Sequence, residues 1–408
     1  MRGRDFQCSH GDTLLSVSLL YGADCRESLR NIKTGSVHCC ITSPPYWNLR
    51  DYGVASQVWG GDPDCDHWWD GSNCPKCGAW SGQLGLEPTP DLYVQHLVEV
   101  FREVRRVLHP SGTLWLNLGN SYMSHPAKNF DNMGGESGCR IREDPALAAA
   151  TVVGKPRVDG LKSKDLVGTP WMVAFALRVD GWWLRSEIIW AKPNPFPSSV
   201  SDRPTTAHEH VFLLAPNEHY FYDAEAIREQ GTTGAWDAMP PIGGVKHLES
   251  TGSMNPTYSG KMPAGDGKHH KRTVWPVATE AYEGAHFAVW PPALVEPMVL
   301  AGTSQAGCCP VCHTPWQRGS SSNRARKVGD WSPVCLCPSA PPVPCTVLDP
   351  FSGSGTTGLV ATQNGRSFIG LDLNEEYLDL AESRIRGAAE KEDPTKDWSE
   401  SAREFFSS

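Results

Sequence analysis

The sequence contains no apolar run close to the ~18 residues that a membrane-spanning helix requires. Its N-terminal residues 1–6 also lack the apolar stretch of a secretory signal. We therefore expect a soluble, cytoplasmic protein with no membrane partner. With 39% hydrophobic and 20% charged residues, its 408 residues are enough for one large folded domain or two ordinary ones.

Positive charge is also in short supply, since 37 Lys and Arg residues face 46 Asp and Glu residues, for a formal net charge of −9. This balance excludes a protein that coats nucleic acid through bulk charge, although a local basic groove remains compatible with it. The densest basic stretch holds Lys261, Lys268, Lys271 and Arg272, together with two histidines. A solvated loop is the alternative interpretation of this stretch.

Cysteine, in contrast, is abundant: fourteen cysteines in a chain without an export signal indicate reduced thiols or metal ligands rather than disulfides. The pair Cys309 and Cys312 is separated by 22 residues from the pair Cys335 and Cys337. Two tight thiolate pairs bridged by a loop suit tetrahedral zinc. A second candidate site has a mixed donor set, namely Cys65, His67, Cys74 and Cys77. Both would be structural sites, and unligated cysteine is the alternative for each.

Periodicity and capping residues predict alternating strands and helices. Thr89, Pro90 and Asp91 begin a helix over 90–108, between strands at 37–41 and 113–118. Further strands are expected at 184–190, 210–214, 346–349 and 367–372, with helices at 356–363 and 375–388. This order favours an α/β fold with a mostly parallel sheet.

The pattern Gly353-x-Gly355-x-x-Gly358 follows one predicted strand and opens a helix, and Asp372 lies 23 residues beyond Asp349. This context is typical of a Rossmann-like site for an adenosine-containing ligand. An acid at the loop entrance would repel a pyrophosphate but attract the sulfonium and ammonium of S-adenosylmethionine. That acid is Asp349, and the alternative is that it only caps the turn. A nicotinamide-dependent oxidoreductase remains a rival.

The second unusual loop is Ser43-Pro44-Pro45-Tyr46. Its two prolines fix the backbone and remove two N–H donors, so the loop presents acceptors. The Ser43 oxygen and the Pro44 carbonyl could hold the hydrogens of an exocyclic amino group out of plane, which would localise its lone pair. Tyr46 offers a face for a flipped base. A purely structural turn is the alternative.

Segments 42–47 and 349–357 together resemble the DNA amino-methyltransferases, which make cytosine-N4 or adenine-N6 methyl groups. The likeness extends to 181–185, 286–288 with Pro291, and 370–372. The reactive loop precedes the cofactor loop, which matches the β class. The resemblance implies a circularly permuted Rossmann-like methyltransferase fold with a mostly parallel sheet, and the cysteine spacings add zinc-ribbon-like insertions to it. It also implies a bacterial or phage-infected bacterial cell.

Carried over by position, the resemblance implies that Asp349, Phe351, Gly353 and Gly355 surround the methionine moiety. The rest of that loop would also contact the cofactor, through Pro350, Ser352, Ser354 and Thr356. Asp372 would bind the ribose. Asp24 would bind the adenine, and the alternative is that it is a surface acid. His286 and Phe287 would close over the cofactor, and the alternative is that they are a packed pair in the core. Trp47, Arg50 and Tyr52 either line the same mouth or pack in the core.

The expected activity is S-adenosylmethionine-dependent methylation of a flipped base in double-stranded DNA, with Ser43, Pro44, Pro45 and Tyr46 holding the base. Serine at the head of the loop favours cytosine-N4, and adenine-N6 is the alternative. A non-catalytic zinc-containing DNA-binding protein is a rival from another class. A homodimer and a restriction endonuclease partner both remain open.

The expected domain plan divides the chain at its insertions. The catalytic part takes 1–60, 81–120 and 166–223, and the cofactor-binding half takes 276–304 and 344–390. The Cys/His insertion covers 61–80, a variable insertion 121–165, a target-recognition region 224–275, the four-cysteine insertion 305–343 and a flexible tail 391–408.

Overall fold

The computed structural model describes residues 2–123, 158–195, 197–230, 268–280, 290–319 and 329–391. Within these residues one sheet has nine strands. In spatial order they are β1 (Arg2–His10), β2 (Thr13–Tyr21), β15 (Ser367–Asp372), β14 (Thr346–Asp349), β3 (Val37–Thr42), β6 (Leu108–Leu118), β8 (His208–Ala215), β7 (Trp183–Ala191) and β11 (Val274–Pro276).

Most of the sheet is parallel. Strands β2, β15, β14, β3 and β6 pair in parallel, while β1 and β8 run against their neighbours. The cofactor strand β14 lies between β15 and the reactive strand β3, although it comes some 300 residues after β3 in the chain. The predicted α/β class, the mostly parallel sheet and the permuted order are therefore confirmed.

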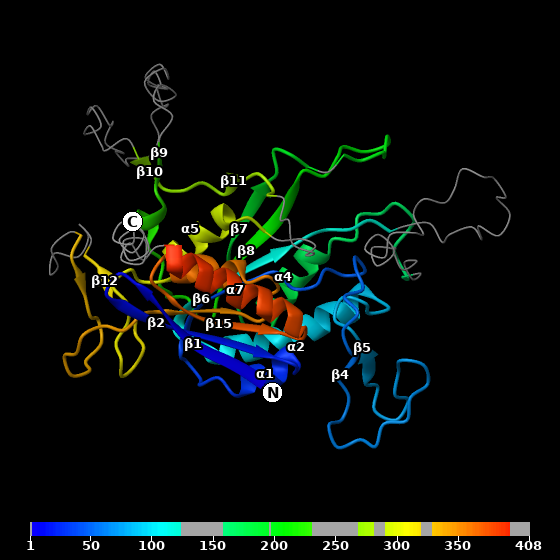
Figure 1. The fold of residues 1–408 in the computed structure, drawn as a ribbon. Helices are drawn as coiled ribbons and strands as arrows, with labels where there is room; N and C mark the ends of the chain where they lie inside the picture. The colour runs from blue at the N-terminus through cyan, green and yellow to red at the C-terminus, as the bar shows by residue number, and fades with distance from the viewer. Residues whose placement is uncertain are drawn as a thin grey trace, which may run out of the picture.

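Helices cover both faces of the sheet (Figure 1). One face packs against α1 (Cys25–Arg30), α2 (Pro90–Val107) and α4 (Thr169–Val179). The other packs against α5 (Pro292–Gly302), α6 (Thr356–Gln363) and α7 (Glu375–Lys391). Strand β3 is buried along its whole length, as expected for a central parallel strand.

The predicted helix at 90–108 is confirmed with its cap, because the Thr89 hydroxyl accepts from the Leu92 amide at 3.2 Å and Pro90 takes the first turn. Strand β6 begins at Leu108, five residues before the predicted start at Thr113, because Leu108 already pairs with Val37 and an irregularity in the ladder precedes Thr113. The hairpin of β1 and β2 was not anticipated. No helix among the described residues is long and apolar enough to cross a membrane.

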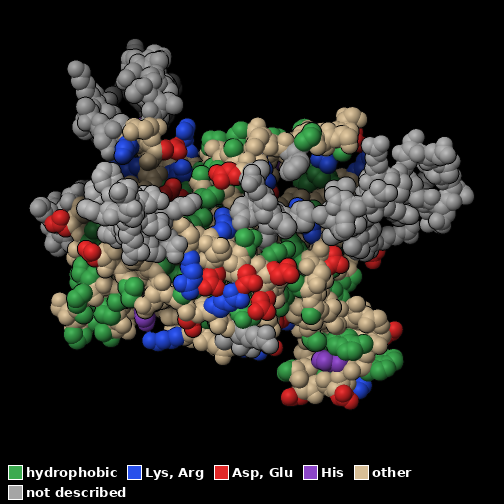
Figure 2. Space-filling model, viewed as in Figure 1, with side chains coloured by type: hydrophobic (Ala, Val, Ile, Leu, Met, Phe, Trp, Pro, Cys, Tyr) green, Lys and Arg blue, Asp and Glu red, His purple; other side chains and the backbone are tan. Residues whose placement is uncertain are grey.

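Two lobes extend from the sheet at opposite ends of Figure 1. One lies between β4 (Gln57–Trp59) and β5 (Trp80–Gly82), at lower right, and stands away from the body in Figure 2. The other holds β12 (Gln317–Arg318) and β13 (Trp331–Ser332), at left. The remaining short elements are a 3₁₀ helix η2 (Ala224–Ile227) and the pair β9 (Glu229–Gln230) and β10 (Lys268–His269).

Candidate active site

The carboxyl ends of three adjacent parallel strands bring the two predicted loops together. Strand β14 pairs with β3 on one side and β15 on the other. The loop after β3 carries Ser43 to Tyr46, and the loop after β14 carries the glycine pattern. Tyr46 and Phe351 pack against the same apolar core, on the face of α1, α2 and α4. The two loops therefore open at one edge of the sheet.

Asp349 links the two loops. Its Oδ1 accepts from the Thr42 hydroxyl at 2.7 Å and from the Phe351 amide at 3.1 Å, while its Oδ2 accepts from the Thr357 hydroxyl at 2.7 Å. Asp349 is 2% exposed, and burial raises its pKa to about 6 even though these hydrogen bonds lower it. No cation of the described residues pairs with it. Asp349 thus caps the turn and also offers a buried carboxylate that a cationic ligand group would fit.

The glycines of the cofactor loop serve conformation and packing. Gly353 and Gly355 have positive φ values of 49° and 76°. A Cβ at Gly355 would lie 2.5 Å from the Ala381 side chain, and one at Gly358 would lie 2.5 Å from the Phe368 ring. The pattern therefore sets both the tight turn and the close approach of α6 to its neighbours, as in other Rossmann-like sites.

The other residues of this loop differ in their burial and in their hydrogen-bond partners. Pro350 is buried, and the Ser352 hydroxyl is buried without a hydrogen-bond partner among the described residues. The hydroxyls of Ser354 and Thr356 both accept from Arg384 on α7, at 2.8 and 3.1 Å, so they tie the loop to this helix. His286 and Phe287 lie outside the described residues.

Asp372 ends β15 and supports the same loop. Its Oδ2 accepts from the Gly353 amide and its Oδ1 from the Asn374 amide, each at 2.9 Å. Burial raises its pKa to about 6. Tyr52 and Tyr377 lie close enough for the charge of Asp372 to raise their pKa values further, beyond the effect of burial. Asp372 therefore stands among aromatic side chains at the carboxyl edge.

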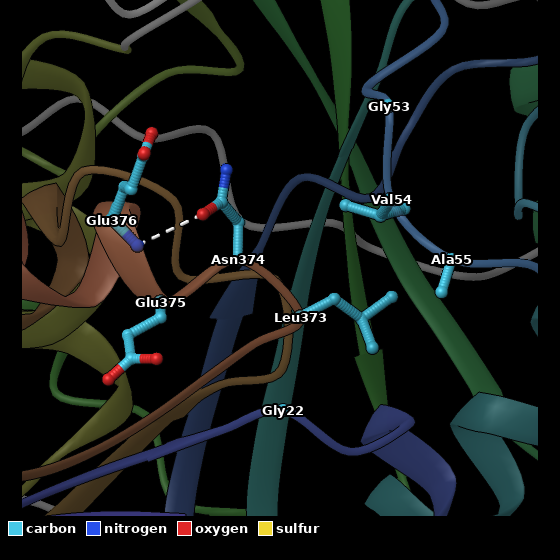
Figure 3. Close-up of a pocket in the computed structure, with 8 residues that line it drawn as sticks. All are labelled: Gly22, Gly53, Val54, Ala55, Leu373, Asn374, Glu375 and Glu376. Atoms are coloured by element: carbon cyan, nitrogen blue, oxygen red, sulfur yellow. Dashed lines mark hydrogen bonds between the residues drawn. The ribbon is translucent and has the colours of Figure 1, made fainter.

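A cavity of about 460 Å³ opens beside Asp372, lined by the chain after β2, the loop after the reactive residues and the start of α7. Figure 3 shows the side chains of Leu373 and Val54 coming from two segments that face each other across it. Asp24 lies two residues beyond the lining Gly22, but its carboxylate caps α1 and pairs with Arg26. Its side chain is 10% exposed, so it is not a surface acid.

The reactive loop rests on a polar network that sequence reasoning missed. The Ser43 hydroxyl donates to Asn117 Oδ1 at 3.2 Å, and the Tyr46 hydroxyl lies 2.8 Å from the same oxygen and 2.7 Å from Glu209 Oε2. Burial and Glu209 raise the pKa of Tyr46, which keeps it a donor. Lys192 pairs with Glu209. The one sequence signal that could have revealed this network is Asn117, a polar residue in the apolar run of β6.

The remaining residues of this loop have distinct environments. The Pro44 carbonyl accepts from no donor in the described part of the chain, whereas the Pro45 carbonyl accepts from the Tyr93 hydroxyl at 2.8 Å. Trp47 is 1% exposed and belongs to the core, so the packing alternative holds for it. Tyr52, in contrast, lies near Asp372 and the cavity.

Three of the four basic residues predicted to contact DNA lie in and just after the short strand β10. Lys268 is exposed in β10, and the ammonium of Lys271 lies 5.0 Å from the centre of the Trp275 ring. Arg272 pairs with Glu229. Lys261 lies outside the described residues.

Both predicted cysteine clusters are assembled. In each, the four ligand atoms lie within 4.8 Å of one another: Cys65, His67, Cys74 and Cys77 form one set, and Cys309, Cys312, Cys335 and Cys337 the other. The Cys65 and Cys74 sulfurs are 4.0 Å apart, close to the ~3.8 Å edge of a zinc–thiolate tetrahedron. The donor sets and their geometry fit zinc.

A third group, His38 with Cys308 and Cys345, is also compact. His38 Nδ1 accepts from the Thr346 amide at 2.9 Å, and its Nε2 donates to the His313 carbonyl at 2.8 Å. Because both ring nitrogens are engaged by the backbone, neither has a lone pair left for a metal. This group is therefore explained by packing.

Comparison with known proteins agrees with this geometry. The family model described as DNA methylase matches residues 37–383. The Type II methyltransferase M.Cfr9I of Citrobacter freundii is 35% identical over 91% of this chain and 89% of its own, and M.SmaI of Serratia marcescens is 36% identical over 91% of each. The solved PvuII DNA methyltransferase (cytosine-N4-specific) aligns with a TM-score of 0.49 and 14% identity over 92% of each chain, a likeness too weak to support an argument.

With its permuted sheet, its paired loops and these relatives, the chain belongs to the DNA methylase family and is a site-specific DNA amino-methyltransferase, which uses S-adenosylmethionine to methylate DNA.

Proposed function

We propose that the protein methylates the N4 amino group of a cytosine flipped out of double-stranded DNA. The observation that carries this proposal is the Thr42–Asp349 hydrogen bond, which joins the end of the reactive strand to the end of the cofactor strand at 2.7 Å. A base held by the first loop would thus lie beside a cofactor held by the second.

The reactive loop offers two acceptors for the amino group. The Ser43 hydroxyl can donate its proton to Asn117 Oδ1 at 3.2 Å or to the Tyr46 hydroxyl at 3.3 Å, and either bond leaves its oxygen lone pairs free. The Pro44 carbonyl accepts from no donor of the described chain. Both oxygens would draw the amino hydrogens and localise the nitrogen lone pair. Tyr46, anchored through its hydroxyl, would stack on the flipped base. Pro45 fixes the backbone between them.

The cofactor loop supplies complementary charge. S-adenosylmethionine brings a methyl group activated by a sulfonium. Asp349, buried and without a cation partner in the described chain, would attract the positive groups of the methionine moiety, next to Phe351, Gly353 and Gly355. Asp372 would accept from the ribose hydroxyls, and the adjacent cavity would hold the adenine. Asp24, His286 and Phe287 stay predictions as cofactor contacts.

Serine rather than aspartate at the head of the loop favours cytosine. A neutral hydroxyl is a weaker acceptor than a carboxylate and gives less charge assistance. The test is mass spectrometry of nucleosides from unmethylated genomic DNA treated with the protein and S-adenosylmethionine. We expect N4-methyl-2′-deoxycytidine, and N6-methyl-2′-deoxyadenosine as the product would overturn the choice of base.

The role of the loop is tested separately. Ser43→Ala and Tyr46→Ala are expected to lower methyl transfer by about 100-fold or more while binding of S-adenosylhomocysteine is retained. Calorimetry with S-adenosylhomocysteine and a labelled-methyl assay measure the two quantities. Loss of cofactor binding in both variants would show that the loop serves the cofactor instead.

Structural zinc in both cysteine clusters is part of this proposal. Zinc would hold two turns that have little apolar surface of their own, and neither donor set leaves an open position for catalysis. Elemental analysis of protein purified without chelators is expected to give one zinc for each cluster. Substoichiometric zinc would remove the proposal.

We further propose that recognition of the DNA sequence lies in 224–275, with 121–165 as the second region. Lys261, Lys268, Lys271 and Arg272 would contact phosphates, which makes binding sensitive to salt. Charge reversal at Lys268 and Lys271 should weaken DNA binding, and unchanged binding would refute this placement. A restriction endonuclease partner and a homodimer also stay predictions, the second testable by light scattering.

A further inference from the structure

A buried hydrogen-bonded pair of side chains, Glu87 and His96, lies next to the reactive loop, outside the groups already described. His96 Nδ1 and Glu87 Oε1 are 2.9 Å apart, and the two side chains are 2% and 0% exposed. The other carboxylate oxygen of Glu87 accepts from the Gly85 amide at 2.8 Å. Burying two such polar side chains costs desolvation free energy, so the pair by itself is weak evidence for a contribution to stability. Its role follows from the groups that it contacts.

Those connections lead to the reactive loop. The Gly85 carbonyl accepts from the Asn48 amide at 2.6 Å, and the Glu87 carbonyl accepts from the Trp47 indole at 3.0 Å. A Cβ at Gly85 would lie 3.2 Å from both the Pro45 side chain and the Tyr46 carbonyl oxygen. The loop therefore rests on Gly85, whose position Glu87 fixes.

Helix α2 adds a third support. The Tyr93 hydroxyl, on a side chain 1% exposed, donates to the Pro45 carbonyl at 2.8 Å. The segment from Gly85 to Tyr93 thus anchors the far half of the loop, from Pro45 to Asn48. Ser43 and Pro44 receive no bond from this segment, so their acceptors stay available while their backbone is held.

The Glu87–His96 pair is itself held by the neighbouring lobe. The His96 ring stacks with both Trp59 and Trp80, with ring centres 4.8 and 5.4 Å away. These two tryptophans are opposite one another in β4 and β5, at the base of the Cys65–Cys77 cluster. A Cβ at Gly61 would lie 2.8 Å from the Cys77 sulfur, so the cluster packs tightly on the hairpin.

We propose that Glu87 and His96 are positioning residues through which the Cys65–Cys77 zinc lobe sets the geometry of the reactive loop, so that the metal in this lobe affects turnover more strongly than cofactor affinity. This inference rests on the proposed roles of the reactive loop and of zinc. Its physical basis is that a misplacement of about 1 Å costs about 100-fold in rate when reacting atoms must be aligned. The glycine loop is held from outside this lobe by Asp372 and Arg384, whereas residues 53–55 of the adjacent cavity lead into β4.

The first test compares variants of the support with a matched buried histidine at the other edge. Tyr93→Phe removes one oxygen and is expected to lower kcat about tenfold or more with unchanged affinity for S-adenosylhomocysteine. Glu87→Ala should lower kcat about 100-fold, and Glu87→Gln, which keeps an acceptor for Gly85, should recover part of that loss. His38→Gln is the control, with a lower unfolding midpoint and the kcat of the parent.

The possible outcomes distinguish a positioning role from a merely structural one. If Tyr93→Phe folds and keeps the parental kcat, the positioning role is wrong, even if Glu87→Ala fails to fold. If every variant, His38→Gln included, loses kcat in proportion to its unfolding midpoint, the pair is merely structural and the inference is also wrong. If the parent protein transfers no methyl group to DNA, the proposed function fails instead.

The second test addresses the metal. Cys74→Ser with Cys77→Ser is expected to lose one zinc and at least about tenfold more kcat than Cys309→Ser with Cys312→Ser, with a loss of affinity for S-adenosylhomocysteine that is smaller than its loss of kcat. Elemental analysis, calorimetry and the labelled-methyl assay give the three readouts. Equal losses of kcat in the two double variants would overturn the link between this lobe and turnover.

Discussion

The two cysteine clusters contain the same kind of local turn but lie at different edges of the sheet. In the first, the amide of Gly78 donates to the Cys74 carbonyl at 2.8 Å, with φ of 77° at the glycine. In the second, the amide of His313 donates to the Cys309 carbonyl at 2.9 Å, with φ of 60°. Each turn is a Cys-Pro-x-Cys sequence followed by a residue in the left-handed region.

Their surroundings are opposite. The Cys65–Cys77 cluster stands on Trp59 and Trp80 and connects to the reactive loop at the carboxyl edge. The Cys309–Cys337 cluster contacts the amino edge, where the His313 carbonyl accepts from His38 at the start of β3. A ligand motif of this kind therefore predicts a metal-binding turn, whereas its place along the sheet decides which loops it contacts.

The largest expected effect concerns the carboxyl edge. Asp349→Asn removes the buried charge, so affinity for S-adenosylmethionine should fall by about 100-fold or more. Calorimetry measures this. Cys345→Ser, just before the same strand at the amino edge, is the control and should keep the parental affinity. Equal affinities for Asp349→Asn and the parent would remove the functional difference between the edges.

Next in size is the pH dependence of binding. The pKa values of Asp349 and Asp372 are raised to about 6 by burial, so both carboxylates are charged above pH 6 and take up protons below it. Cofactor affinity should therefore be constant above this value and fall by about tenfold per pH unit and per carboxyl below it. The same two groups disfavour the ligand-free fold above pH 6 and cease to do so near pH 4.

The amino edge gives the contrast for this prediction. Burial and the neighbouring His38 and His313 lower the pKa of His109 to about 4, so His109 stays neutral between pH 5 and pH 7. A change of affinity across that range therefore does not come from His109. An affinity that stays constant from pH 7 to pH 5 would contradict the assignment of the two carboxylates.

A smaller effect is expected from removing metal at the amino edge. Cys309→Ser with Cys312→Ser should lower the unfolding midpoint by several degrees, since a clamp on a polar segment stabilises the fold. Differential scanning calorimetry with and without added zinc measures the shift. An unfolding midpoint that changes neither with the substitution nor with added zinc would show that this turn folds without metal.

The smallest expected effect is that of Thr42→Val. It leaves one oxygen of Asp349 without its hydroxyl donor, at a cost of about 1 kcal/mol, or roughly fivefold in cofactor affinity. The Thr357→Val variant, on the other oxygen, should behave alike because its bond is equally short. A much larger loss in one variant than in the other would show that the two loops are not equally tied to Asp349.

Local signals were enough to predict most elements of the sheet. Thr89, Pro90 and the apolar spacing located α2, and the glycine pattern placed α6 after β14. The β1–β2 hairpin is closed by a local turn, but its place in the sheet depends on the pairing of β2 with β15, which is distant in sequence. The residues after β3 and β14 meet because their strands are neighbours in the sheet, and only the family order suggested that.

The support of the site could not be predicted from the sequence. Asn117, Glu209, Glu87 and His96 have no motif, and their importance comes from partners 9 to 163 residues away. A polar residue in an apolar strand marks Asn117 as unusual but does not name Tyr46 as its partner. Long-range contacts of this kind arise from packing rather than from local pattern.

The most direct test of the central claim is the structure of the protein with S-adenosylhomocysteine bound. The account predicts the adenine in the cavity beside Asn374, the methionine moiety at Asp349, and the sulfur facing the loop of Ser43 and Tyr46. A ligand bound at the amino edge, or a sulfur on the far side of Asp349 from Ser43, would contradict it.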